Sequence, residues 1–183
     1  MSDYKIIVPS GSMQNLVTNP SFETNTTGWA TGGTNTIAQT TVRAKFGAYA
    51  LRATYQDTEG LADYGITLTA AAHTLVAWVY IPAVYDGTQL ALKFSAFAGA
   101  GGTLSVNLDM TIRGEWQKAV VDGTPVAGDL VGILRLREDG AAPTAGRFVD
   151  IDGVSCVPSA NEYTHIENMV GDAKVYANLF LQE

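Results

Sequence analysis

Short segments of alternating apolar and polar residues recur along this 183-residue chain, and they constrain its fold more than any other feature. Turn-forming sequences rich in Gly, Asp and Thr separate them, such as TGGTN, YDGT and EDGAAPTAG. Helical periodicity is nearly absent. Strands that recur about every 8 to 12 residues with such turns between them predict an all-β sandwich or barrel.

Ten strands are expected from this pattern. They are Asn15 to Glu23, Asn35 to Val42, Ala48 to Tyr55, Ala62 to Leu68, Thr74 to Pro82, Gln89 to Ala98, Thr103 to Thr111, Trp116 to Asp122, Leu130 to Glu138 and Arg147 to Val157. Residues 15–157 therefore form the predicted sandwich. Residues 1–14 are predicted to be an extended N-terminal arm. The C-terminal tail, residues 158–183, has period-2 apolar positions from Val175 to Leu181 that predict one added strand.

Composition limits the classes of partner. A hydrophobic content of 46% and a charged content of 16% are typical of a globular protein. A net charge of −7 with 11 scattered basic residues argues against a nucleic-acid partner, which requires clustered Lys and Arg. No segment approaches the roughly 20 apolar residues that span a membrane, and no signal-peptide core is present, so we expect synthesis and assembly in a cytoplasm. The single Cys156 cannot form an internal disulfide.

The stretch NLVTNPSFETNTTGW, residues 15–29, combines an apolar start with an early proline. Pro20 lacks a backbone donor, so it favours an edge strand or a bulge and places this first strand at a sheet margin. Phe22 is then expected to point inward, with Glu23 at the strand end beside a polar turn. A carboxylate at such a corner can meet either a cation or backbone N–H groups.

This opening resembles that of carbohydrate-binding modules of the family 4/9/22 jelly-roll group, which begin with an Asn-x-Phe-Glu strand and a Gly-Trp turn. Further segments resemble the family in the same order: KFGAYALRAT, HTLVAWVYIP, GEWQKAVVDGTP and RFVDIDGVSCV. The resemblance covers residues 15–157 and implies a two-sheet jelly-roll β-sandwich. It also places Trp29 and Trp116 at positions similar to structural tryptophans of the family, so we expect both in the core.

The resemblance implies one structural calcium ion, held by the opening Glu and the closing Asp of the module. Glu23 and Asp152 occupy these positions, and backbone carbonyls near Thr24 and Lys45 would complete the site. Two carboxylates and carbonyl oxygens suit this hard cation. Gly153 stands where the family usually has a second Asp. The alternative is that Glu23 and Asp152 only cap turns.

A glycan-binding surface is expected on an outward sheet face. In TLVAWVYIP, Leu75, Ala77, Val79 and Ile81 suit the interior, so Trp78 and Tyr80 point outward. In LVGILRLR, alternation likewise turns Arg135 outward. Aromatic rings can cover the apolar face of a pyranose while polar groups bind its hydroxyls, which makes Trp78, Tyr80 and Arg135 the candidate carbohydrate-binding residues. The alternative is that the terminal arms or a neighbouring subunit cover these aromatics.

No nucleophile motif, phosphate loop or metal-protease signature is present, and His73 and His165 are isolated from other metal-ligand residues. We therefore expect a protein that is not an enzyme and assign no catalytic residue. The NLVTNPSFE opening also resembles domains of tailed-bacteriophage minor tail and capsid-decorating proteins. This resemblance, together with the two flanking arms, makes the leading interpretation a virion structural protein on the particle exterior, assembled in the host cytoplasm.

In this interpretation, the arms add strands to neighbouring virion subunits, the protein is a homo-oligomer, and its jelly roll adheres to host or environmental glycans. The alternative is a free carbohydrate-binding module, taken from a polysaccharide-degrading enzyme or acting as a lectin. Neither interpretation includes nucleic acid or a membrane.

Overall fold

A computed structural model describes residues 15–57, 60–98, 102–125 and 131–158. This part of the chain is all β and contains no helix, hence no helix able to cross a membrane. Its strands are β1 (Trp29–Ala30), β2 (Thr36–Thr40), β3 (Ala50–Thr54), β4 (Gly60–Thr67), β5 (His73–Tyr80), β6 (Leu90–Ala98), β7 (Gly102–Asn107), β8 (Trp116–Gly123), β9 (Val131–Glu138) and β10 (Phe148–Pro158). The arm at 1–14 and the added strand predicted in the tail fall outside the described residues.

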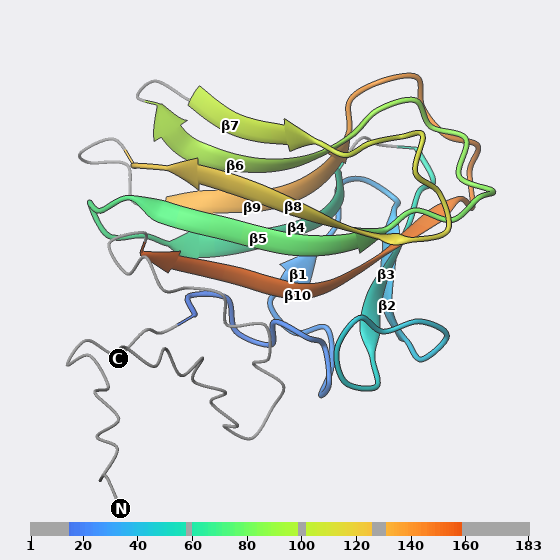
Figure 1. Ribbon diagram of the computed structural model, residues 1–183, viewed down its shortest axis with the longest axis horizontal. Coiled ribbons are helices and arrows are strands. Elements are labelled where there is room, and N and C mark those ends of the chain that lie inside the picture. The colour runs from blue at the N-terminus through green and yellow to red at the C-terminus, as the bar shows by residue number, and fades with distance from the viewer. Residues whose placement is uncertain (1–14, 58–59, 99–101, 126–130, 159–183) are drawn as a thin grey trace, which may run out of the picture.

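The strands form two five-stranded antiparallel sheets that pack face to face (Figure 1). Sheet A has the order β1-β4-β9-β6-β7, and sheet B has the order β2-β3-β10-β5-β8. Strands far apart in sequence are therefore neighbours: β10 lies between β3 and β5, and β9 lies between β4 and β6. The predicted fold, a two-sheet jelly-roll β-sandwich, is confirmed.

The core lies between the sheets and follows the predicted alternation. On β5, Leu75, Ala77 and Val79 are fully buried, whereas Trp78 and Tyr80 are half-buried on the other face. On β6 and β9, the inward positions Leu90, Leu92, Phe94 and Leu136 are also buried. Alternation works here because successive side chains of a strand point to opposite faces.

The N-terminal segment is not the regular strand that we predicted. Asn19 and Phe22 have left-handed backbone conformations, with φ of 55° and 59°, which interrupt any extended run. The segment nevertheless lies beside β10, beyond the end of its pairing with β3, because Leu16 N–H donates to Cys156 O at 2.9 Å and Val154 N–H donates to Pro20 O at 2.9 Å. Phe22 is fully buried, as expected.

The two tryptophans expected in the core differ. Trp29 is buried at 7% exposure and packs on Phe22 and Tyr64. Trp116 is only half-buried, so its assignment to the core is wrong. It begins β8 opposite Tyr80 of β5, and a residue opposite Tyr80 points to the same outer face of sheet B.

Candidate functional site

The three residues predicted to bind carbohydrate do not share one surface. Trp78 and Tyr80 lie on β5 in sheet B, whereas Arg135 lies on β9 in sheet A. Each points away from the core of its own sheet, so the two groups face opposite sides of the sandwich. The expectation of a single platform is wrong because alternation tells which way a side chain points, but not to which sheet its strand belongs.

The aromatic residues of sheet B are covered in part by the loop between β2 and β3. Lys45 Nζ lies 4.1 Å from the centre of the Trp78 ring, and the Phe46 ring meets Trp78 edge-on at 6.2 Å. Arg43 Cζ lies 4.4 Å from the centre of the Tyr80 ring. The predicted arms, which fall outside the described residues, are therefore not the only candidate cover: the sandwich's own loop places cations on these rings.

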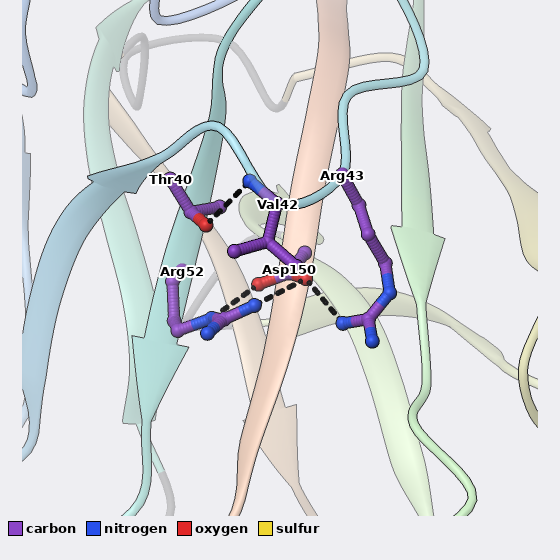
Figure 2. A network of polar contacts seen from close by, with 5 residues as sticks. All are labelled: Thr40, Val42, Arg43, Arg52 and Asp150. Carbon is purple, nitrogen blue, oxygen red and sulfur yellow. Dashed lines mark hydrogen bonds and ion pairs between the residues drawn. The ribbon is translucent and has the colours of Figure 1, made fainter.

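A buried carboxylate organises the centre of this face (Figure 2). Asp150 on β10 is fully buried and accepts two hydrogen bonds from Arg52 of β3, at 2.8 and 3.0 Å. Arg43 reaches the same carboxylate from the loop side at 3.2 Å. Arg52 also lies over the ring of Phe148, with Cζ 3.8 Å from its centre. One negative charge thus orients two guanidinium groups, each of which also contacts an aromatic ring.

The two predicted calcium ligands come together at the same loop. Asp152 Oδ2 accepts the N–H groups of Lys45 and Phe46 at 2.7 and 2.8 Å. Glu23 Oε1 accepts the N–H groups of Ala48 and Tyr49, both at 3.0 Å. The alternative from the sequence, that both carboxylates cap turns, therefore describes their hydrogen bonds in this structure.

Burial perturbs the titration of one of these carboxylates. Asp152 is fully buried, and burial raises the pKa of its carboxyl from 3.8 to about 6, with a further upward contribution from the charge of Glu23. Neither group pairs with a Lys or Arg side chain in the described part of the chain. Two neighbouring unpaired carboxylates fit a hard cation. The described residues nevertheless place no third Asp, Glu, His or Cys beside them.

Gly153, which the resemblance placed where the module family has an Asp, has a steric role in this chain. Gly153 has a left-handed φ of 56° and lies at the β-bulge of β10. A Cβ atom at this position would stand 2.5 Å from the Phe46 ring and 3.2 Å from the Trp78 ring. A side chain at residue 153 would therefore displace the loop. A metal ion at Glu23 and Asp152 would have to take its remaining ligands from other groups.

The outer face of sheet A carries a row of polar groups around Arg135. Register aligns Asp63 of β4, Arg135 of β9, Lys93 of β6 and Ser105 of β7 across four neighbouring strands. Arg135 donates two hydrogen bonds to Asp63, at 2.8 and 2.6 Å, and Asp63 raises the pKa of the guanidinium further. Lys93 pairs with Asp139 at 2.7 Å. The side chains of Arg135 and Lys93 remain 36% and 21% exposed.

No family model matches the sequence, and no curated protein matches it. Solved structures do match the fold. The CBM22-1 xylan-binding domain of Xyn10C from Paenibacillus barcinonensis is similar over 82% of this chain and 97% of its own, at 18% identity and a TM-score of 0.59. TmCBM61, solved in complex with β-1,4-galactotriose, is similar over 79% of this chain and 99% of its own, at 21% identity and a TM-score of 0.56.

A third similar structure is the C-terminal family 22 module of Xyn10B from Clostridium thermocellum. It covers 76% of this chain and 90% of its own, at 14% identity and a TM-score of 0.59. The chain therefore has the β-sandwich fold of carbohydrate-binding modules. It spans nearly the full length of the three modules named here. At these identities the likeness establishes the fold alone.

Proposed function

We propose that this protein is a non-catalytic carbohydrate-binding module whose ligand, a neutral glycan, lies on the outer face of sheet A. The observation that carries this proposal is the polar row Asp63, Arg135 and Lys93, which crosses three adjacent strands and remains partly open to solvent. The fold also supports the proposal, because structures similar to this chain include a xylan-binding domain and a module in complex with β-1,4-galactotriose.

The chemistry of the row suits sugar hydroxyls. A pyranose presents neighbouring hydroxyl groups that both donate and accept hydrogen bonds. The Asp63 carboxylate accepts such bonds, while the guanidinium of Arg135 and the ammonium of Lys93 donate them. The bidentate pairing of Asp63 with Arg135 holds both side chains in place before the ligand arrives, which lowers the entropy lost on binding.

The test is a calorimetric titration with xylan and β-1,4-galactan oligosaccharides. Arg135→Gln removes a charged donor, and the loss of a charge-assisted hydrogen bond costs about 1.5 to 3 kcal/mol, or at least tenfold in affinity. Arg147→Gln is the matched control, since it removes one charge from an exposed ion pair with Asp86 in the loops. Equal affinity in the wild type and in Arg135→Gln, with both proteins folded, would reject the assignment.

The setting of the module is a separate question. The fold likeness to modules such as those of Xyn10C and Xyn10B favours the second interpretation from the sequence, a free carbohydrate-binding module or lectin. The role as a phage tail or capsid-decorating protein, the virion partners and the homo-oligomer remain predictions.

We further propose that Glu23 and Asp152 hold a structural calcium ion. The support is that the fully buried Asp152 of β10 and the nearby Glu23 of the N-terminal segment both accept N–H groups of the same loop, with no described Lys or Arg pairing with either. The ion would supply positive charge and hold residues 45–49 against β10. Its place is structural, because both carboxylates lie beneath the loop rather than on an open face.

A further inference from the structure

The outer face of sheet B bears cationic groups stacked on aromatic rings. Arg43 lies on Tyr80, Arg52 on Phe148, and Lys45 on Trp78, with centre distances of 4.4, 3.8 and 4.1 Å. Lys118 of β8 also approaches Trp78, at 5.9 Å. These contacts join five segments of the chain, the β2–β3 loop and strands β3, β5, β8 and β10, so this arrangement, which we call the cation–aromatic face, is a product of the tertiary fold.

The face presents positive charge to solvent although the whole protein has a net charge of −7. The Asp150 carboxylate is fully buried and meets two guanidinium groups, which leaves one positive charge in that cluster. The arginine side chains keep 31% and 25% of their surface exposed, and Lys45 is exposed beside them. The Asp150 carboxylate is thus hidden while these cations reach the surface. An exposed carboxylate of this face, Asp122, lies four residues beyond Lys118 on β8 and accepts a hydrogen bond from Thr74.

Apolar groups lie among these cations. Register places Arg52, Asp150, Tyr80 and Trp116 in one row across β3, β10, β5 and β8. With about 4.8 Å between strands, the row spans about 14 Å. The Tyr80 and Trp116 rings meet edge-on at 5.7 Å, and both are half-buried. Val42, which lies over Asp150 between the two arginines in Figure 2, is 67% exposed.

We propose that the cation–aromatic face binds an acidic polysaccharide, a chain of uronic acid units. Each unit carries a carboxylate, which pairs with a guanidinium or an ammonium group, and a pyranose ring whose C–H groups contact Tyr80, Trp116 and Val42. The site lies on the opposite side of the sandwich from the polar row of sheet A, so it does not depend on the proposed neutral-glycan function.

A single-stranded nucleic acid also combines negative charges with rings, but the cations that lie on the aromatic rings of this face disfavour it as the ligand. Single-stranded nucleic acid binds by stacking bases on open aromatic faces. Here Trp78, Tyr80 and Phe148 each already carry a cation from the chain itself. A pyranose can instead contact Trp116 and the exposed Val42, while its carboxylate pairs with the stacked cations from the solvent side.

The test compares a variant that removes two lysines from the face of sheet B with a variant that removes an arginine from the face of sheet A. The probe is a polygalacturonate oligomer, titrated into the wild type, Lys45→Gln/Lys118→Gln and Arg135→Gln in 50 and 500 mM NaCl. We expect the lysine variant to lose at least tenfold in affinity for polygalacturonate, while Arg135→Gln binds it as the wild type does. High salt should weaken wild-type binding, since exposed charges are screened.

A xylan oligosaccharide in the same series separates this proposal from the proposed function. Loss of xylan binding only in Arg135→Gln, with polygalacturonate binding lost only in the lysine variant, supports two independent faces. Polygalacturonate binding without any xylan binding supports the face on sheet B and rejects the neutral-glycan function alone. No polygalacturonate binding, loss of it in Arg135→Gln, or tighter binding of a single-stranded oligonucleotide would overturn the acidic-polysaccharide proposal.

Discussion

At the scale of single residues, we expect Asp152 to govern how the stability of the protein responds to pH and to calcium. Its carboxyl is buried beneath the loop of residues 45–49, and its pKa is raised to about 6, first by burial. The folded state therefore holds the Asp152 proton more tightly than the unfolded chain, whose carboxyl titrates near 3.8. The stabilisation from this proton is complete below about pH 3.8 and disappears as the pH rises through about 6.

In a metal-free buffer, we expect Asp152 to lower the free energy of unfolding by up to about 3 kcal/mol between pH 3.8 and pH 7. Asp152→Asn has no titrating group at this position. The free energy of unfolding of the wild type minus that of the variant should therefore fall as the pH rises over the same range. Urea unfolding at a series of pH values measures it. A difference that stays constant with pH would show that the carboxyl is not perturbed.

Calcium should offset the loss of stability that the ionised Asp152 causes at neutral pH. With the ion at 100 times its dissociation constant, a single site adds about 2.7 kcal/mol to stability. For a domain of this size, that raises the melting temperature by about 5 to 10 °C. Glu23→Gln should abolish the shift, whereas Glu115→Gln, an exposed carboxylate at the start of β8, should keep it. A calcium effect of equal size in Glu23→Gln would remove this site from consideration.

At the scale of elements, the bulge of β10 sets how the β2–β3 loop packs on sheet B. The bulge falls between Asp152 and Ser155. Asp152 accepts the loop's N–H groups just before it, and Gly153 leaves room for Phe46 within it. The same loop brings Arg43 and Lys45 onto the aromatic rings. One irregular strand therefore supports both the proposed calcium ligands and the cation–aromatic face.

Gly153→Ala should destabilise the protein by at least about 1 kcal/mol, because alanine is strained at a left-handed φ and its Cβ would collide with Phe46. Gly65→Ala on β4 is the matched control, since a Cβ there meets nothing within 4 Å. We expect the control to change stability by no more than about 0.5 kcal/mol. Chemical denaturation of both variants measures the difference, and equal stability would show that the loop moves freely away from residue 153.

At the scale of the whole molecule, the sandwich separates two surfaces of different charge chemistry. Sheet A presents paired charges, Asp63 with Arg135 and Lys93 with Asp139. Sheet B presents cations above buried carboxylates. The protein has the fold of carbohydrate-binding modules over nearly their full length.

We expect the full chain to be a monomer in solution, with a mass near 19.4 kDa by light scattering. A free module needs no partner to complete the sandwich, whereas a virion component is expected to self-associate through its arms. A stable oligomer that becomes monomeric when residues 1–14 or 158–183 are removed would favour the virion interpretation instead.

The sequence by itself determined the β-sandwich class, the inward positions of β5 and β6, and the pairing of Glu23 with Asp152 near one loop. It could do so because strand alternation depends only on local sequence, and because the resemblance to a module family identified the first and last segments of the sandwich, which carry Glu23 and Asp152. It placed Trp116 in the core and the residues 15–23 in a strand, both wrongly. Left-handed backbone at Asn19 and Phe22 has no signal comparable to a glycine.

Only the tertiary structure decided which outward residues share a surface. Arg135 and Trp78 both point outward, but strand order assigns β9 to sheet A and β5 to sheet B. The partners of each face, Asp63 and Lys93 on one side and Arg43 and Lys45 on the other, come from strands and a loop distant in sequence. Alternation fixes a side chain relative to its own strand, whereas non-local strand pairing chooses its neighbours.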